Sequence, residues 1–210
     1  MGGSSRPKPP KRGFVKRILL LSGGLDSSMI AAIERPDLTL MIDYGQRPAQ
    51  AEAAAAAAIA RHLGLQHVAL KIDLSSIGSG LLVGSQQNSP APTPEWFPFR
   101  NQFLATAAAA YAVNNGFDEV HLGTVAGDGA RHADGTPAFV AALDDVMRLQ
   151  EGAIRVRAPH IDSDPTELLR RSGLPEGVAR WTFSCHTGNL ACGQCPGCNR
   201  RRDLLVGTWN

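Results

Sequence analysis

The sequence predicts an α/β fold built on a doubly wound parallel sheet. Short apolar runs alternate with longer helix-compatible stretches along the chain. Strands written as continuous apolar runs are typical of parallel sheets whose two faces are both covered by helices. The chain has 210 residues, and 43% of them are hydrophobic, which suits one compact domain with its own core and a small appendage.

The first third of the chain has the pattern β-α-β-α-β. We expect strands at 18–21, 38–43 and 67–72, and helices at 28–33 and 49–63. The alanines at 53–58 are taken as helix-forming residues that allow close packing, since Ala is the best helix former. Residues 75–98 are rich in Gly, Ser and Pro, and they are too many for a plain connection. They predict a loop or lid on the substrate side.

The rest of the chain continues the pattern. We expect helices at 101–114, 137–150 and 166–172, and strands at 119–123 and 154–156. Gly173 and Pro175 end the last of these helices, because neither residue continues a helix well. In a doubly wound sheet the ligands bind at the carboxyl ends of the strands, so site residues are expected there.

The formal charge of +2 hides an asymmetry. Six basic residues precede the first strand without any acid among them: Arg6, Lys8, Lys11, Arg12, Lys16 and Arg17. The remaining 15 basic residues face 19 acidic ones, so the body of the protein carries about −4. A body of this charge is not a general nucleic-acid binder.

The N-terminal tail, residues 1–13, predicts a disordered basic segment because it is rich in Gly, Ser, Pro and Lys. It lacks the apolar region of a signal peptide, and Arg6 stands where a myristoylation signal has Ser or Thr. The alanine-rich stretch 53–60 is too short to span a membrane and is flanked by Glu52 and Arg61. We therefore expect a cytoplasmic protein without a membrane partner.

The motif Ser22-Gly23-Gly24-Leu25-Asp26-Ser27 follows the first apolar run and leads into a helix-compatible stretch. A glycine turn between a strand and a helix lets the backbone approach an anion, and the N–H groups and dipole at the helix start favour negative charge. The hydroxyls of Ser22, Ser27 and Ser28 add donors. The motif predicts phosphate binding, and the alternative is an ordinary strand-turn-helix connection with chance glycines.

The motif lacks the Lys of a Walker loop and the third glycine of a dinucleotide fingerprint. It resembles instead the Ser-Gly-Gly-x-Asp-Ser loop of the ATP pyrophosphatases, the PP-loop enzymes of the adenine nucleotide α-hydrolase type. These enzymes use ATP to adenylate a substrate and release pyrophosphate. The resemblance implies that ATP is the nucleotide and that Asp26 binds Mg²⁺ directly or through water.

All four cysteines fall near the C-terminus, at Cys185, Cys192, Cys195 and Cys198. In a chain without an export signal, overlapping C-x-x-C steps indicate a metal more readily than a disulfide. Four thiolates leave no open position on Zn²⁺, so the zinc is expected to be structural. The alternatives are an iron–sulfur cluster, a redox dithiol, and a site in which His186 replaces Cys185.

The loop and the cysteine cluster together, in this order, resemble the 7-cyano-7-deazaguanine synthase family of the queuosine precursor pathway. The resemblance extends from Ile18 to Leu205 and divides the chain at 14–180, the ATP pyrophosphatase domain, and 181–210, the zinc-binding segment. Four further stretches carry it: Asp43-Tyr44-Gly45-Gln46-Arg47 with Glu52 beyond it, Phe97-Pro98-Phe99-Arg100-Asn101-Gln102-Phe103-Leu104, Gly123 followed by Asp128, and Trp181-Thr182-Phe183-Ser184-Cys185.

The family resemblance implies an activity and a set of roles. Family members use ATP to activate the carboxylate of 7-carboxy-7-deazaguanine, amidate it with ammonia, and then activate and dehydrate the amide to a nitrile. Backbone at 42–44 is expected to meet the adenine, while Arg47 and Arg100 hold phosphate or substrate carboxylate. The catalytic residues by this resemblance are Asp26, Arg47, Arg100, Asp128 and His132. ATP contacts are expected at Leu21, Ser22, Gly23, Gly24, Leu25, Asp26, Ser27, Ser28, Ile42, Tyr44, Asn101 and Gly123.

The chain departs from the family pattern at two places. Pro48 stands where the family usually has His, which removes a titratable group and a backbone donor. Residues 128–136, Asp-Gly-Ala-Arg-His-Ala-Asp-Gly-Thr, replace a loop that contacts the deazaguanine and the amine in relatives. Within them, His132 beside an acid is a candidate base for an incoming amine, although a polar loop with ordinary turn chemistry also explains Arg131, His132 and Asp134.

Three functions are therefore open from the sequence. The family default is amide formation with ammonia, leading to the nitrile. The second is a divergent paralogue of the kind found in bacterial antiphage operons, which joins the deazaguanine to a protein N-terminal amine, so that a protein is a substrate. The third is a non-catalytic zinc module that binds RNA through Arg200, Arg201, Arg202 and the basic tail. A homodimer is expected because family members often pair.

Overall fold

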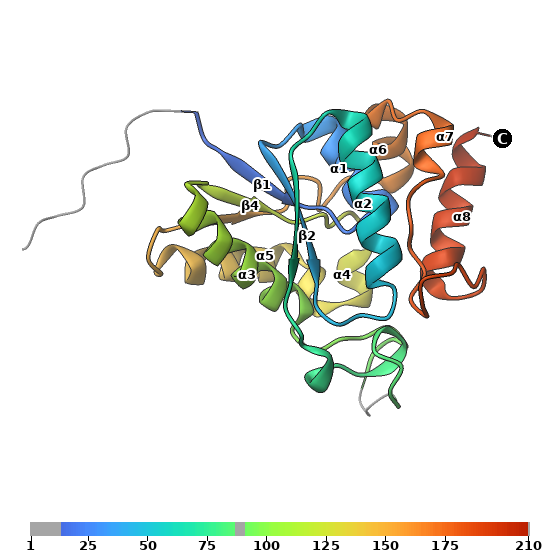
Figure 1. Ribbon diagram of the computed structural model, residues 1–210, viewed down its shortest axis with the longest axis horizontal. Helices are drawn as coiled ribbons and strands as arrows, with labels where there is room; N and C mark the ends of the chain where they lie inside the picture. Colours follow the sequence, from blue (N-terminus) through green and yellow to red (C-terminus); the bar gives the residue numbers. More distant parts are fainter. Residues whose placement is uncertain (1–13, 87–90, 210) are drawn as a thin grey trace, which may run out of the picture.

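The computed structural model describes residues 14–86 and 91–209, so the predicted basic tail lies outside the described residues. Within this part, one parallel sheet has the strand order β3-β2-β1-β4-β5 (Figure 1). The strands are β1 (Arg17–Leu20), β2 (Leu38–Asp43), β3 (His67–Lys71), β4 (Glu119–His121) and β5 (Arg155–Arg157). The predicted doubly wound parallel sheet is confirmed.

The strand order reverses between β1 and β4. The chain moves outward from β1 through β2 to β3 and then crosses back to β4, which pairs with the other side of β1. The loops that leave these two neighbouring strands therefore part in opposite directions. A crevice at the carboxyl ends is the usual ligand site of such a sheet.

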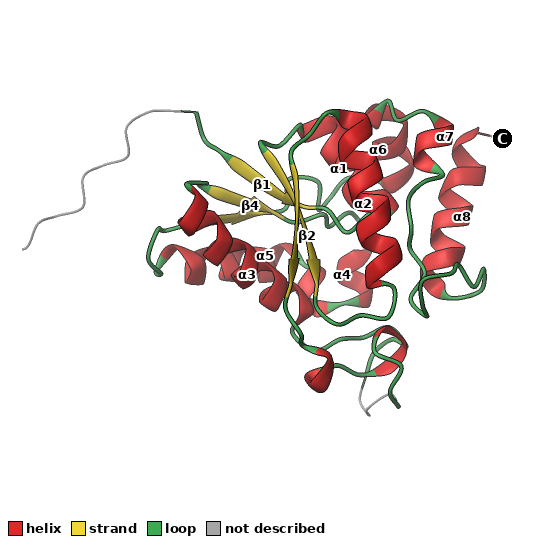
Figure 2. Ribbon diagram, viewed as in Figure 1, coloured by secondary structure: helices red, strands yellow, loops and turns green. Residues whose placement is uncertain are grey.

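Helices cover both faces of the sheet (Figure 2). One face carries α1 (Leu25–Glu34), α2 (Ala49–Leu63) and α6 (Pro165–Ser172), and the other carries α3 (Arg100–Asn115) and α5 (Pro137–Arg148). Neighbouring strand residues point to opposite faces, so Ile18 belongs to the core under α3 and α5 while Leu19 belongs to the core under α1 and α2. None of the helices among the described residues has the length and apolar character needed to cross a membrane.

Buried alanines let the helices approach the sheet closely. Ala56 on α2 and Ala108 on α3 are fully buried in the two cores. Each helix then ends at a glycine with positive φ, Gly64 after α2 and Gly116 after α3. A left-handed residue at this position satisfies the last carbonyls at no steric cost for glycine. The predicted limits of α2 and β2 agree with the structure.

The C-terminal segment contains a helix that the sequence pattern did not predict, α8 (Pro196–Trp209). Only Leu205 of this helix is buried, and it shares the core of α1 and α6. The helix therefore lacks the apolar stripe by which surface helices are recognised in a sequence. A four-residue helix, α7 (Glu176–Ala179), precedes it.

The two predicted loops contain short helices. Residues 128–136 form α4 (Asp128–Arg131) and the 3₁₀ turn η3 (Ala133–Gly135), so the expectation of a plain loop there is corrected. The segment after β3 contains the 3₁₀ turns η1 (Ser75–Ile77) and η2 (Gly80–Leu82) and projects from the carboxyl-end side of the sheet (Figure 1). It is anchored there by Phe97, whose ring contacts Tyr44 edge to face at 5.3 Å.

Candidate active site

A cavity of about 300 Å³ opens at the carboxyl ends of β1, β2 and β4, where the strand order reverses. Several segments line it: the loop after β1, the end of β2 with the start of α2, the segment before α3 with the start of that helix, the loop after β4 with α4, and the C-terminal segment. The cavity brings together most of the sequence-predicted site residues, namely Leu21, Ser22, Gly24, Leu25, Asp26, Ser27, Ile42, Tyr44, Arg100, Asn101, Gly123, Asp128 and His132.

The loop after β1 presents backbone donors to this cavity. Gly24 is the N-cap of α1 and has no side chain, so no side-chain acceptor satisfies the first N–H groups of the helix. The Ser22 and Ser27 hydroxyls lie 3.1 Å apart, and the Ser22 oxygen accepts a hydrogen bond from the Gly24 N–H. Free amides at a helix start beside two hydroxyls make a binding site for an anion such as phosphate.

Gly23 and Ser28 shape this loop and do not line the cavity. At Gly23, where φ is +79°, a Cβ atom would lie 2.4 Å from the Glu52 carbonyl oxygen, so only glycine lets the loop rest on α2. The Ser28 side chain is fully buried, and its hydroxyl donates to the Gly24 carbonyl at 2.7 Å. Its hydroxyl is thus used within the loop and is not turned toward a ligand.

Asp26 lies in the first turn of α1 and faces the cavity. One carboxylate oxygen, Oδ2, is 3.3 Å from an Arg200 nitrogen, whereas Oδ1 is buried without a hydrogen-bond partner among the described residues. Burial raises the pKa of Asp26 to about 6, with Arg200 opposing the shift and Asp128 adding to it. A carboxylate oxygen without a partner, next to an anion site, is a hard donor that suits Mg²⁺.

Arg200, from α8, connects the two acids of this end of the cavity. It lies 2.8 Å from Asp128 Oδ1 as well as 3.3 Å from Asp26 Oδ2. Its neighbours do not form an exposed basic stripe, since Arg201 donates to the Thr182 hydroxyl and Arg202 pairs with Asp203. This arrangement weighs against the RNA-binding alternative, which requires the three arginines to face solvent.

The start of α3 lines another part of the cavity. Arg100 shares a side-chain hydrogen bond with Tyr44, and burial raises the pKa of Tyr44 to about 12 while Arg100 partly opposes the shift. Asn101 is held by the loop after β4: its backbone N–H donates to the Asp134 carboxylate at 3.1 Å, and its amide donates to the Asp134 carbonyl at 3.0 Å. Asp134 thus satisfies the helix start, and its charge also reaches His132.

His132 has a second acidic neighbour besides Asp134, which its sequence position does not indicate. Its Nε2 lies 3.8 Å from Oε1 of Glu95, which also forms an ion pair with Arg131. Burial, followed by the charge of Arg100, lowers the pKa of His132. Glu95 lies in the segment before α3, where only the Pro and Arg-Asn positions carry a motif, so nothing in the sequence singled it out.

Glu52 and Gln46 form a second acidic feature in the cavity. The Gln46 amide donates to the Glu52 carboxylate at 2.7 Å and accepts from the Tyr44 N–H at 2.8 Å. Burial raises the pKa of Glu52 to about 7, opposed by the bond from Gln46 and by the charge of Arg100. Glu52, on α2, therefore holds the segment after β2 through Gln46. The backbone carbonyl of Glu52 also lies against Gly23.

Arg47 is the one predicted catalytic residue that the structure separates from this cavity. Its side chain is exposed and lines a separate, more open hollow with Asp43, Lys71 and Asn189. Its stem lies against Gly84, and its backbone N–H donates to the Leu82 carbonyl at 2.7 Å. Arg47 therefore anchors the projecting segment. The guanidinium groups that line the cavity belong to Arg100, Arg131, Arg200 and Arg201.

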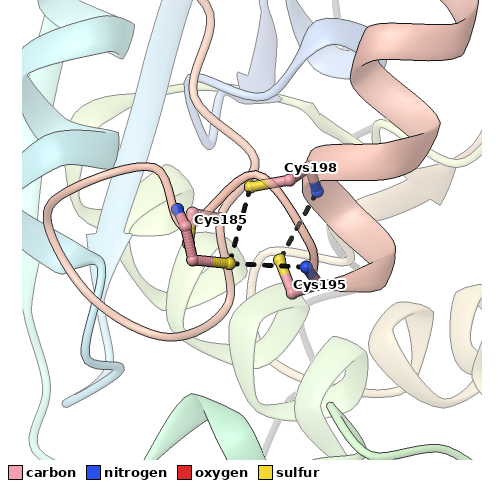
Figure 3. A group of neighbouring side chains, drawn as sticks. Cys185, Cys195 and Cys198 are labelled. Carbon is pink, nitrogen blue, oxygen red and sulfur yellow. Dashed lines mark hydrogen bonds between the residues drawn. The ribbon is translucent and has the colours of Figure 1, made fainter.

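The four cysteines come together, as their spacing predicts. The sulfur atoms of Cys185, Cys192, Cys195 and Cys198 all lie within 4.8 Å of one another, and Figure 3 shows three of them turned toward a common centre. Tetrahedral Zn²⁺ with Zn–S bonds of about 2.3 Å requires sulfurs about 3.8 Å apart, so the group fits this ion. His186 is not part of the group; its ring lines the cavity, and burial lowers its pKa to about 4.

Backbone amides point at the sulfurs, as they do around thiolates. The N–H groups of Cys195 and His186 approach the sulfurs of Cys192 and Cys195 at 3.3 and 3.4 Å. Such N–H donors stabilise negative sulfur and orient it toward a metal. The four-cysteine cluster is consistent with the predicted zinc knuckle.

The segment that holds the cysteines, residues 183–198, is joined to the phosphate-type loop, residues 22–27. The Phe183 N–H donates to the Gly23 carbonyl at 2.8 Å, and Ser184 lines the cavity beside Gly24. At Gly197 a Cβ atom would lie 1.9 Å from the Ser184 carbonyl oxygen, so the start of α8 packs directly on the stretch before the cluster. The cluster therefore sets the position from which Arg200 enters the cavity.

Comparison with known proteins gives the same assignment as the motifs. The family described as "Queuosine biosynthesis protein QueC" matches residues 16–207. A 7-cyano-7-deazaguanine synthase of Nitrosospira multiformis is 32% identical over 90% of this chain and 90% of its own length. A protein of the same name from Nitrosomonas eutropha is 34% identical over 89% of this chain and 91% of its own length. Another, from Methanospirillum hungatei, is 32% identical over 91% of this chain and 94% of its own length. The chain belongs to the QueC family.

Proposed function

We propose that this protein adenylates the carboxylate of 7-carboxy-7-deazaguanine with ATP and couples the activated carbonyl to an amine, as a carbon–nitrogen ligase. The observation that carries the proposal is the Asp26 oxygen without a partner among the described residues, next to the free amides at the start of α1. The names of the relatives, which cover about nine-tenths of this chain, support the substrate. Ammonia is the amine by family default; a second ATP then adenylates the amide oxygen, which leaves with AMP, and the nitrile is the final product.

Different residues of the cavity have different roles in this reaction. The amides and hydroxyls of residues 22–27 bind the β- and γ-phosphates, and the backbone at 42–44 meets the adenine. Mg²⁺, when it is bound at Asp26, neutralises phosphate charge. Arg100 orients the substrate carboxylate, for which a guanidinium is well shaped. The zinc at the four cysteines is structural and holds the segment that carries Arg200.

This placement of ATP and substrate determines which bonds form and break in the two steps. An oxygen of the substrate carboxylate attacks the α-phosphorus, the bond to the β-phosphate oxygen breaks, and pyrophosphate leaves. The amine nitrogen then attacks the carbonyl carbon, and AMP leaves with the oxygen that came from the substrate. The proton that the amine loses passes to solvent.

A second candidate joins the deazaguanine to a protein N-terminal amine. It is favoured by residues 128–136, which replace the family's amine-side loop and place Arg131 and His132 in the cavity. The adenylation half of the reaction is the same in both candidates. We also propose a homodimer, and a boundary at 180/181 between the ATP pyrophosphatase domain and the zinc-binding segment.

The test is to incubate the protein with ATP, Mg²⁺, 7-carboxy-7-deazaguanine and ammonium and to weigh the products by mass spectrometry. The ammonia reaction predicts AMP, pyrophosphate, and the amide or nitrile. AMP without either product contradicts ammonia as the amine, and a deazaguanine mass on a partner protein then establishes the second candidate. Asp26→Asn is expected to lower pyrophosphate release about 100-fold or more, whereas Asp145→Asn, on the exposed side of α5, leaves it unchanged. Full turnover by Asp26→Asn contradicts the site.

A further inference from the structure

Among the charged side chains of the cavity are two groups that share no ion pair with each other among the described residues. One group, Asp26, Asp128 and Arg200, lies at the loop that the proposed function assigns to phosphate. The other is centred on Glu95, which pairs with Arg131 and lies near His132. The short helix α4 connects them, since Asp128 belongs to the first group and Arg131 to the second. The proposed function uses the first group for ATP and leaves Glu95 without a role.

Glu95 is buried but only partly satisfied. It is 3% exposed, and it lines the cavity. Its Oε1 atom carries both the ion pair with Arg131 and the contact with His132, whereas Oε2 is buried and has no hydrogen-bond partner within the part of the chain that the structure describes. A buried carboxylate oxygen without a donor is costly, so its position indicates that a ligand supplies the donor.

The charge around Glu95 selects the kind of donor. Arg131 already balances the carboxylate, and the charge of Arg100 reaches the same cluster of side chains. The site has no excess negative charge that would attract an ammonium ion. A neutral N–H group can still donate to Oε2, because accepting it requires a lone pair and not a net charge. The ligand group at Glu95 is therefore a neutral nitrogen donor.

We propose that Glu95 is a specificity residue that accepts hydrogen bonds from the ring N–H and exocyclic amine of a 2-aminopyrimidin-4-one ring. This inference rests on the proposed function and names how its substrate is read. Two adjacent donors on one ring edge match the two oxygens of a carboxylate. An adenine-type edge has an acceptor beside its amine, and that acceptor would face a carboxylate lone pair. Glu95 therefore favours the guanine-type ring and rejects the adenine-type ring.

The shape of the substrate agrees with this orientation. In 7-carboxy-7-deazaguanine the carboxylate is on the five-membered ring, and the two donors are on the far edge of the six-membered ring. When the donor edge lies at Glu95, the carboxylate points away from it, toward the rest of the cavity. The apolar side chains of Leu82, Leu104 and Leu122 line the same cavity and suit the faces of a planar ring.

The test compares two ligands on the same protein by calorimetry. The probes are 7-carboxy-7-deazaguanine and its counterpart without the exocyclic amine, 7-carboxy-7-deazahypoxanthine. The native protein is expected to bind the first about 10-fold or more tightly than the second. In Glu95→Gln the preference falls to within about threefold, because the amide replaces one acceptor by a donor. Glu151→Gln, at an exposed position, keeps the native preference.

Each outcome decides something different. A native protein that binds both ligands equally, or a Glu95→Gln variant with the native preference, overturns the role of Glu95 while the proposed function stands. A native protein that binds neither ligand but still binds ATP overturns the substrate of the proposed function and this inference with it. Unchanged affinity of Glu95→Gln for a non-hydrolysable ATP analogue shows that the variant is folded. If Glu95→Gln does not fold, Glu95→Asp takes its place and is expected to lower the preference, and the native preference in a folded Glu95→Asp overturns the role of Glu95.

Discussion

At the scale of single residues, Arg200 controls the charge balance beside the phosphate-type loop. Asp26 and Asp128 repel each other, and the charge of Asp128 raises the cost of ionising Asp26. Arg200 lies between them and lowers that cost. The same acids are hard oxygen donors at this end of the cavity, so a cation such as Mg²⁺ would compete with the guanidinium for them.

A double-mutant cycle measures the pair formed by Arg200 and Asp128. With Arg200→Met and Asp128→Asn we expect a coupling free energy of about 1 kcal/mol in urea unfolding, because both side chains are partly buried. The matched pair on the same helix, Arg202 and Asp203, is exposed and should couple by less than about 0.5 kcal/mol. Equal couplings for the two pairs contradict the assignment of Arg200 to the cavity.

Glu52 makes the free energy of unfolding depend on pH. Its ordinary pKa of 4.5 rises to about 7 in the folded chain because burial disfavours the charged form. Between these two values the folded chain holds a proton that the unfolded chain releases, so stability falls as pH rises. Glu52→Gln should lose less stability than the native protein between pH values of about 5 and 7.5 in urea unfolding. Glu151→Gln serves as control, and the same loss in Glu52→Gln and native protein contradicts the raised pKa.

At the scale of elements, the glycine loop depends on contact with α2. Gly23 and Gly64 both have positive φ, but a Cβ atom at Gly23 would strike the Glu52 carbonyl whereas at Gly64 it would meet nothing within 4 Å. Gly64→Ala is therefore expected to cost about 1 kcal/mol of unfolding free energy, the cost of the backbone conformation alone. Gly23→Ala should cost about 2 kcal/mol more because of the collision. Similar losses in the two variants would show that the loop does not rest on α2.

The C-terminal segment depends on the cysteine cluster, because α8 buries only Leu205 and has little core of its own. Removal of zinc by a chelator, or Cys195→Ser, is expected to expose the amides of residues 181–209 to hydrogen exchange, while the amides of β1 and β2 stay protected. Metal analysis should give one zinc ion per chain. A metal-free protein with full protection and full activity would contradict this role of the cluster.

The sequence predicts an element well where neighbouring residues determine its limits, and poorly where contacts with distant residues determine them. β2 and α2 were predicted at their true limits because the strand is a continuous apolar run and Gly64 ends the helix. The helix α8 was missed because its start is set by the cysteine cluster and its surface has no apolar stripe. The glycine loop and the four cysteines are local motifs, so the sequence alone indicates them. The pair of Arg200 with Asp128 joins residues 72 positions apart, which no local pattern reveals.

At the scale of the whole molecule, the reversal of the strand order determines where the site lies. β1 and β4 are neighbours in the sheet, so the loop after β1 and α4 after β4 face each other across one cavity. The C-terminal segment closes the cavity from a third side through the bond between Phe183 and Gly23. The loop at residues 22–27, the acids and the apolar side chains thus meet in one space, which is the arrangement that the proposed activation of a carboxylate needs.

In the proposed reaction this cavity activates a carboxylate by joining it to the α-phosphorus of ATP. An experiment with 7-carboxy-7-deazaguanine that carries ¹⁸O in its carboxylate, followed by mass spectrometry of the products, reports on this bond itself. Because the substrate oxygen attacks phosphorus and leaves with the nucleotide, we expect one ¹⁸O atom in the AMP and none in the pyrophosphate. AMP without the label, or ¹⁸O in inorganic phosphate together with ADP, would show that the carboxylate is not activated in this way.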